Sequence, residues 1–237
     1  MVVALVIYVS VPQNKSVATL YKEFETRLLS FGAKRSKVFS VEYRMYYSAG
    51  VNKTRCHVLY STDYPSSCFI LPDETPSVVM TKDPIMDPAG SSNLYVYKDS
   101  DIPRSLLNMN SMILTDYMVL PIISEMIENN ILESNEYKLC ATGDIYLWGV
   151  MHFKIGRILT TDQQCKGLII EIANTTVRNI SDAWNSIREF LTKMPISEPI
   201  SICFRHVTTL KPTWDTFHPQ EIAIQYIDIF DKIRRDV

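Results

Sequence analysis

Apolar residues recur along the first third of this chain with spacings that switch between those of strands and those of a helix. Residues 2–11 are rich in β-branched side chains and carry no charge, so they predict a buried strand. Residues 16–31 repeat apolar positions at helical spacing, with Ser16 as the N-cap and Gly32 as a left-handed stop. The strand pattern then returns, and strands are predicted over residues 38–48, 56–62, 68–72 and 77–81.

The middle of the chain repeats this organisation. Residues 116–130 have helical spacing, with Met118, Ile122 and Met126 on one face. An antiparallel meander follows, with turns predicted at Thr142-Gly143, at Ile155-Gly156 and at Asp162 to Lys166. Its strands are predicted over residues 136–141, 144–154, 157–161 and 166–173.

Two further amphipathic helices are predicted at 182–194, with Ser181 as its cap, and at 221–235, and a short strand at 200–204 separates them. The strands cluster in groups and do not alternate singly with helices, which predicts an α+β fold: an antiparallel open β-barrel or curved sheet with flanking helices. We expect residues 1–237 to form a single barrel domain. An irregular acidic insertion is predicted at about 82–115, where prolines and acids replace the periodic pattern.

The stretch LYSTDYPSSCFIL, residues 59–71, contains a cysteine beside two serines and raises the question of a nucleophile. Its flanks alternate like strands, and Asp63 to Ser67 has turn chemistry around Pro65, so it predicts a hairpin with a loop of about five residues. No histidine lies near Cys68 in the sequence to activate it. Cys68 is therefore interpreted as a small buried hydrophobic residue.

Charge and cysteine content narrow the class of protein. The net charge is −2, but residues 1–55 hold 9 basic and 3 acidic residues, whereas residues 56–147 hold 4 and 13. This asymmetry fits a basic face and an acidic face that meet different partners, or merely the solvation of surface loops. Five widely spaced cysteines predict neither a disulfide framework nor a zinc site, and favour a reduced intracellular compartment. The apolar opening is too short to span a bilayer, so no membrane association is expected.

No catalytic motif emerges from the sequence. Nucleotide-binding, zinc-protease and kinase signatures are missing, and His152 is interpreted as a barrel-wall residue. A tunnel phosphohydrolase would need several carboxylates facing one metal, whereas the strands offer the lone acids Glu42 and Glu171 in an interior that reads as apolar. We therefore predict a non-enzymatic protein with no catalytic residues, no bound metal and no cofactor.

Large apolar side chains crowd both faces of the strand predicted at 144–154. They are Tyr146, Trp148, Met151 and Phe153. One face of such a strand must be covered either by a helix of the same chain, such as 221–235, or by a partner protein, since aromatic residues and methionine are enriched in interface cores. These four residues are the predicted protein-binding site.

Four parts of the chain share the pattern of one known family: KSVATLYKEFETRLLSFGAKRSKVFSVEYRMYY (15–47), the hairpin 59–71, YKLCATGDIYLWGVMHFKIGRILTTDQQCKGLIIEIA (137–173) with DAWNSIREFL (182–191), and IAIQYIDIFDKIRRD (222–236). On these stretches the chain resembles Mediator subunit 20, the subunit of the Mediator head module related to the TATA-binding protein. These segments follow the family's order and cover roughly half to two-thirds of the chain. Residues 82–115 depart from the family pattern.

The resemblance implies an open β-barrel without catalytic activity, in a stable pair with Mediator subunit 18. It also implies that a C-terminal helix of Mediator subunit 8 tethers this pair to the head module. Through this assembly the chain would act indirectly on RNA polymerase II and the TATA-binding protein in the nucleus, without specific DNA binding. The residues themselves leave two other classes open, a barrel-type small-molecule carrier and a degenerate tunnel phosphohydrolase.

Overall fold

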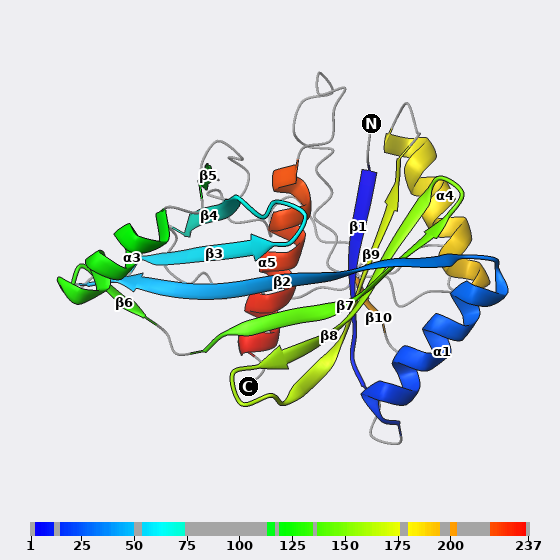
Figure 1. The fold of residues 1–237 in the computed structure, drawn as a ribbon, viewed down its shortest axis with the longest axis horizontal. Helices are drawn as coiled ribbons and strands as arrows, with labels where there is room; N and C mark the ends of the chain where they lie inside the picture. The colour runs from blue at the N-terminus through cyan, green and yellow to red at the C-terminus, as the bar shows by residue number, and fades with distance from the viewer. Residues whose placement is uncertain are drawn as a thin grey trace, which may run out of the picture.

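One antiparallel sheet of ten strands organises the part of the chain that the computed structural model describes. The described residues are 3–11, 15–49, 54–73, 113–116, 119–134, 137–175, 180–194, 200–202 and 219–235. Along the sheet the strands follow the order β10-β1-β9-β8-β7-β2-β3-β4-β5, and β6 pairs with β2 off this path. The sheet curls strongly, and β2 runs across most of the long axis of the molecule (Figure 1).

The strands and helices have the following bounds. The strands are β1 (Val3–Val9), β2 (Lys34–Ser48), β3 (Arg55–Ser61), β4 (Ser67–Asp73), β5 (Ile113–Asp116), β6 (Leu132–Ser134), β7 (Leu139–Trp148), β8 (Met151–Thr160), β9 (Cys165–Asn174) and β10 (Ile200–Ile202). The helices are α1 (Val17–Ser30), α3 (Val119–Glu128), α4 (Ile180–Lys193) and α5 (Pro219–Arg235). The predicted fold class, an α+β protein with a curved open antiparallel sheet and flanking helices, is confirmed.

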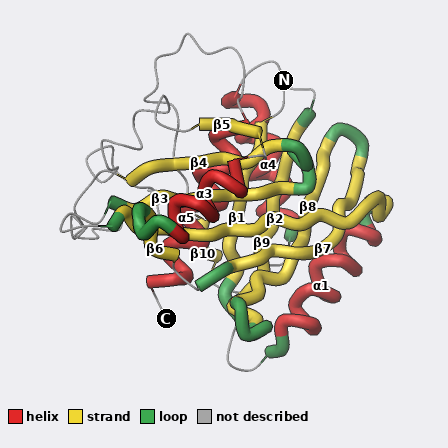
Figure 2. Tube along the Cα trace, turned by 60° about the vertical axis from the view of Figure 1, so that its left-hand side comes forward, coloured by secondary structure: helices red, strands yellow, loops and turns green. Residues whose placement is uncertain are grey.

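Helix α5 fills the inner face of the curled sheet. Its apolar residues, among them Tyr226, Phe230 and Ile233, pack into one core with side chains of β2, β3, β4 and β7. Tyr226 and Phe230 are at most 2% exposed, and Figure 2 shows α5 lying between the strands β3 and β1. The prediction that the helix at 221–235 covers one face of the sheet is confirmed.

Helices α1 and α4 cover the opposite face. Leu20, Phe24 and Leu28 of α1 join Ile187 and Phe190 of α4 in a second core over β1, β8 and β9. Side chains alternate along a strand, so β1 can send Val6 to the α5 core and its neighbours Leu5 and Ile7 to this one. Both faces of the central strands are thus buried by the chain's own helices.

Local signals explain where α1 begins and ends. The Ser16 side chain accepts a hydrogen bond from the Thr19 backbone N–H, which satisfies one of the free donors of the first turn. Gly32 has a φ of +86°, a conformation that costs glycine little, and the chain then enters β2. The predicted N-cap and the predicted glycine stop are both confirmed.

Two of the three predicted turns of the meander are wrong, whereas the third, at Asp162 to Lys166, is confirmed, because β8 ends at Thr160 and β9 begins at Cys165. Gly143 and Gly156 lie opposite each other inside the β7–β8 pair, and the actual turn is Gly149-Val150 between the paired residues Trp148 and Met151. A Cβ on Gly143 would lie 1.8 Å from the Ile155 carbonyl oxygen. This glycine therefore permits a close approach of backbones within the sheet, while Gly149, with a φ of +56°, forms the hairpin turn.

Helix α3 packs on the outer side of β2 to β4 through a different face from the one predicted. Ile123 is buried against Tyr46, Val58 and Cys68, whereas Ile122 is 55% exposed. The prediction had placed Ile122 on the packed face.

Cys68 itself is fully buried, and β3 and β4 form the predicted antiparallel hairpin, with residues 62–66 as its loop.

Most of the predicted insertion at 82–115, and the predicted strand at 77–81, lie outside the described residues. At its end the prediction is wrong, because Ile113–Asp116 forms β5, which pairs with β4.

The prediction of an apolar interior is also wrong. Glu171 is buried beneath α5, where it pairs with Lys154 and accepts a hydrogen bond from the Tyr226 hydroxyl.

Candidate partner-binding site

The four residues predicted to bind a partner lie together at the Trp148 end of the β7–β8 hairpin. Tyr146, Met151 and Phe153 are 0%, 6% and 1% exposed, because α1 and α4 cover them. Trp148 is 38% exposed and is the one member of the set whose side chain reaches the surface substantially. The structure therefore brings the four residues together, and of the four only Trp148 exposes enough of its side chain to contact another molecule.

Trp148 is held by two aromatic rings from the flanking helices. The Phe31 ring at the end of α1 stacks on it with a centroid distance of 5.9 Å, and the Phe190 ring of α4 lies 6.0 Å away. The Arg27 guanidinium lies over the Phe31 ring, with its central carbon 5.3 Å from the ring centroid. The indole is thus supported on one side and open on the other.

Other apolar side chains are exposed next to Trp148. Leu147 is 36% exposed and Val150 is 43% exposed. We call residues Leu147–Val150 the hairpin tip. Three large apolar side chains within four residues of a turn are unusual for a surface that faces only water, where polar turn residues are the rule.

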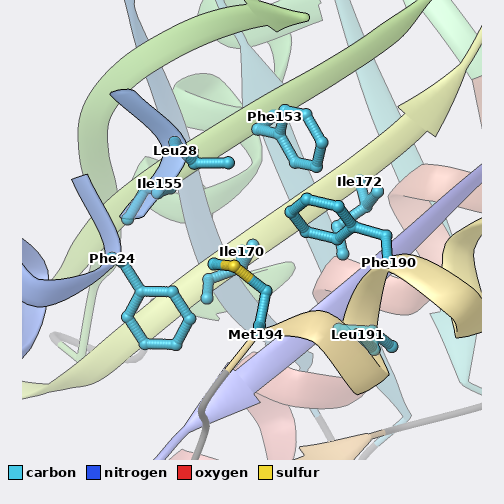
Figure 3. A pocket seen from close by; sticks show the side chains of 9 residues that line it. All are labelled: Phe24, Leu28, Phe153, Ile155, Ile170, Ile172, Phe190, Leu191 and Met194. Carbon is cyan, nitrogen blue, oxygen red and sulfur yellow. The ribbon is translucent and has the colours of Figure 1, made fainter. Parts of the chain in front are cut away.

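Beneath the tip, a crevice runs between α1 and α4. Its free volume is about 10 Å³, roughly what a single water molecule needs. Phe24, Phe153, Phe190 and Met194 are among its lining side chains, which are all apolar (Figure 3). The crevice is therefore a packing gap of the core and is too small for a drug-sized ligand.

A polar network fixes α1, and with it Phe31, against the sheet. The Tyr21 hydroxyl donates to Asp144 Oδ2 at 2.6 Å, and the Arg35 guanidinium donates to Asp144 Oδ1 at 2.6 Å. The Tyr146 hydroxyl donates to Glu25 Oε1 at 2.7 Å. Burial and the hydrogen bond to Asp144 raise the pKa of Tyr21 to about 12, so its hydroxyl remains a donor at neutral pH.

On the inner face, a different set of polar contacts anchors α5 to the sheet. The Gln225 side chain accepts a hydrogen bond from the Val6 N–H at 2.8 Å and donates to the Ala4 carbonyl at 3.2 Å. Lys154 pairs with Glu171 at 2.7 Å and also with Asp63. Burial alone would lower the pKa of Lys154, but Glu171 and Asp63 outweigh it and raise the pKa above its ordinary value.

These buried groups do not resemble a reaction centre. In the described residues no group of three or more His, Cys, Asp and Glu side chains could hold a metal ion. Burial raises the pKa of the Cys56 thiol to about 11, so it stays protonated and is a poor nucleophile at neutral pH. The carrier hypothesis needs an open interior, and the described part of the sheet has its inner face occupied by α5.

An open curled sheet covered on both faces by helices of the same chain defines an α+β half-barrel protein, in which the buried polar groups described above stabilise the packing. A family model for the TATA-binding related factor (TRF) of subunit 20 of the Mediator complex matches residues 1–231. The chain belongs to this Mediator subunit 20 family.

Individual relatives agree with the family match. The chain is 21% identical to Mediator of RNA polymerase II transcription subunit 20 of Drosophila melanogaster, over 95% of this chain and 83% of the relative. It is 20% identical to the protein of that name from Gallus gallus, over 98% of this chain and 94% of the relative. The relatives are components of the transcription machinery, so the chain is a non-enzymatic subunit of a nuclear transcription complex.

Two solved structures are also similar. The Mediator head module of Schizosaccharomyces pombe contains a chain that matches with a TM-score of 0.39 and 10% identity, over 84% of this chain and 98% of that one. A protein from Pyrococcus horikoshii OT3 matches with a TM-score of 0.43 and 10% identity, over 84% of this chain and 94% of that one. Both scores are low, so the functional conclusion rests on the family match.

No helix in the described part of the chain combines the length and the apolar character needed to cross a membrane.

The sequence located the hairpin tip only in part. It indicated Trp148 but assigned equal weight to three residues that are buried, because alternation along a strand does not tell which helices will cover each face. It also missed Leu147 and Val150, since the turn was predicted elsewhere. A signal was present in the dipeptide Gly149-Val150, because a glycine between two apolar runs is typical of a hairpin turn.

Proposed function

We propose that this chain works in the Mediator head module, where it pairs with Mediator subunit 18 and is tethered by the C-terminal helix of Mediator subunit 8. The observation that carries the proposal is the family match over residues 1–231, which spans every described element except the last four residues of α5. Through the head module the chain acts indirectly on RNA polymerase II and the TATA-binding protein. It is a structural link in transcription regulation.

The hairpin tip is the surface on which we place subunit 18. Binding energy in protein interfaces concentrates on a few aromatic anchors that are rigid before the partner arrives. Trp148 meets both conditions, since Phe31 and Phe190 fix its ring and 38% of the residue is still exposed. Tyr146, Met151 and Phe153 support this anchor from the core beneath it.

Co-purification with subunits 18 and 8 tests this proposal. The chain and its Trp148→Ala and Ile131→Ala variants are each expressed with subunit 18 and the C-terminal helix of subunit 8. Ile131 is a matched control, because it is 52% exposed beside β6, at the other end of β2 from the tip. We expect the wild-type chain and Ile131→Ala to pair and Trp148→Ala to pair at least about tenfold more weakly, the loss that roughly 2 kcal/mol of an anchor residue predicts.

Two results would count against the proposal. If the wild-type chain does not pair with subunit 18, the assignment of partners is wrong. If Trp148→Ala, shown to be folded by circular dichroism, pairs as well as Ile131→Ala, the partners are right and the location of the interface is wrong.

Direct recognition of DNA is not part of the proposed function. The chain has a net charge of −2, and its basic residues outnumber acids mainly within residues 1–55. Too few phosphate contacts are available for tight binding at physiological salt. We expect no sequence-selective shift of duplex DNA in a mobility assay with the isolated protein, and a tight selective complex would contradict this expectation.

A further inference from the structure

A basic strand segment lies directly beside the hairpin tip. Residues 26–41 contain Arg27, Lys34, Arg35 and Lys37 and no acidic residue. The first five residues of β2, Lys34 to Val38, are all exposed, and Val38 is 71% exposed. Positive charge and exposed apolar side chains therefore occur together on one short segment.

The segment and the tip form one neighbourhood because β2 pairs with β7. Lys34 lies opposite Leu147, and Val38 lies opposite Asp144 after a register shift that begins at Arg35. On its other side, β2 pairs with β3 only from Val41 onward among the described residues. In the described part of the chain, no strand pairs with the edge of Lys34–Val38 that faces away from β7.

The positive charge of this segment is only partly neutralised by the protein. Arg35 pairs with Asp144, and Arg27 lies over the Phe31 ring while its guanidinium reaches the Lys193 carbonyl at 3.5 Å. The Lys34 and Lys37 residues extend beyond this network on the exposed strand. Because paired residues share a face of the sheet and successive residues alternate, Lys34 lies on the side of Leu147, whereas Val38 lies on the side of Asp144 and Trp148. A segment of another molecule that runs along the edge of β2 can reach both sides, with a carboxylate at Lys34 and apolar side chains at Val38.

We propose that the hairpin tip and the start of β2 bind an acidic amphipathic segment of a partner protein. Apolar side chains of that segment contact Trp148, Val150 and Val38, and its carboxylates meet Lys34 and Lys37. The inference rests on the proposed function, since it gives the chemistry of the segment that the Trp148 surface contacts within Mediator.

The apolar side chains favour a protein segment over a nucleic acid. A single strand of nucleic acid could stack a base on Trp148 and place phosphates near the lysines. Leu147, Val150 and Val38 are aliphatic, however, and their exposed surface is matched by leucine or phenylalanine side chains and by nothing on a sugar-phosphate backbone. An acidic amphipathic segment satisfies both parts of the surface.

The test measures binding of short fluorescent peptides to the isolated full chain by fluorescence anisotropy at physiological ionic strength. One peptide combines Asp and Glu with Leu and Phe. A second replaces its acids by Lys, and a third replaces its Leu and Phe by Ala. We expect only the first peptide to bind saturably, because the surface needs charge and apolar contact together.

Variants of the protein locate the binding. The double variant Lys34→Glu, Lys37→Glu and the single variant Trp148→Ala are each expected to weaken binding at least about tenfold, with folding verified by circular dichroism. The matched control is Arg55→Glu, Lys166→Glu, which changes the net charge equally but lies elsewhere. Arg55 pairs with Tyr47 at the other end of β2, and Lys166 is at the end of β9 remote from Asn174, which pairs with Met151. The control is expected to stay within about threefold of wild type, since screening limits the reach of a distant charge.

Several outcomes would overturn the inference. They are equal loss in the control variant, equal binding of the alanine-substituted peptide, displacement of the peptide by single-stranded DNA at equal concentration, and concentration-dependent self-association that Lys34→Glu, Lys37→Glu abolishes. Failure of the peptide to bind while subunit 18 still pairs with the chain refutes this inference alone. Failure of both experiments refutes the proposed function as well.

Discussion

The two faces of the central strands are closed in different ways. On the inner face, α5 combines apolar packing with buried polar anchors, since Gln225 bonds the backbone of β1 and Tyr226 bonds Glu171. On the outer face, α1 and α4 pack through apolar side chains, and their polar contacts lie nearer the surface. The inner face is filled by α5, whereas the packing on the outer face extends to Trp148, an aromatic residue that is partly exposed.

This difference separates what holds the protein together from what it offers to partners. Buried polar groups that must all be satisfied specify one arrangement of a helix, because any shift leaves a group unpaired. The inner face is therefore a structural unit. At the hairpin tip, the outer face has no comparable set of buried hydrogen bonds to satisfy. There Trp148 stacks on Phe31 and stays partly exposed.

Replacing Phe230 by Ala is expected to have the largest effect on stability. Phe230 is fully buried and contacts Tyr43 and Tyr226 with ring centroids 5.5 and 5.9 Å away. The cavity left by a lost phenyl ring lowers the free energy of unfolding by about 3–5 kcal/mol. Denaturant titration measures this loss, and the same titration of Trp148→Ala should show a loss of under about 1.5 kcal/mol, since that side chain is partly solvated already. Equal losses would remove the distinction between the two faces.

Replacing Glu171 by Ala is expected to cost about 3 kcal/mol, because it leaves the buried Lys154 ammonium with Asp63 as its remaining partner. The matched control is Glu189→Ala, which breaks an exposed pair with Lys193 and should leave the free energy of unfolding nearly unchanged, because solvent screens this pair. Thermal and denaturant unfolding of both variants provide the comparison. A Glu171→Ala variant as stable as the control would show that the inner polar contacts do not anchor α5.

Replacing Gln225 by Ala is expected to lower the free energy of unfolding by about 1–3 kcal/mol, since the Val6 N–H and the Ala4 carbonyl both lose their partner. Gln225→Glu should be at least as harmful, because it removes the donor to Ala4 and buries a carboxyl group. Native-state hydrogen exchange at Val6 gives a local readout. Unchanged protection of that amide in Gln225→Ala would mean that the side chain is not what closes this edge of β1.

Replacing Cys68 by Ala is expected to have the smallest effect. The thiol is a small group in the core under α3, so its loss costs about 1 kcal/mol. Pairing with subunit 18 should be unchanged in a co-purification experiment. A variant that is folded but unable to pair would assign the thiol a chemical role.

Local signals in the sequence were sufficient for the elements that depend on neighbouring residues. Ser16 and Gly32 bound α1 as predicted, and the hairpin of β3 and β4 formed around Pro65 with Cys68 buried. Caps and turns act within a few residues, so the sequence contains their cause. The class of fold followed from the same signals, because the order of helices and strands restricts how a sheet can be covered.

The errors involve contacts between distant residues. Gly143 was interpreted as a turn because a glycine that permits close backbone approach looks the same in sequence as one that permits a turn. The ion pair of Lys154 and Asp63 joins residues separated by 91 positions, and Tyr226 and Glu171 are separated by 55. Ile122 and Ile123 are adjacent, and only the position of α3 on the sheet decides which is buried. All of these contacts depend on how distant segments pack together, which local sequence patterns do not determine.

The central claim is that the exposed end of the outer face meets subunit 18, and site-specific photocrosslinking tests it most directly. A photoreactive amino acid is placed at Val150 in one variant and at Ile131 in another, residues that are 43% and 52% exposed at opposite ends of β2. Each variant is assembled with subunit 18 and the C-terminal helix of subunit 8, then irradiated. The account predicts a crosslink to subunit 18 from position 150 and none from position 131. A crosslink from position 131 alone would contradict it.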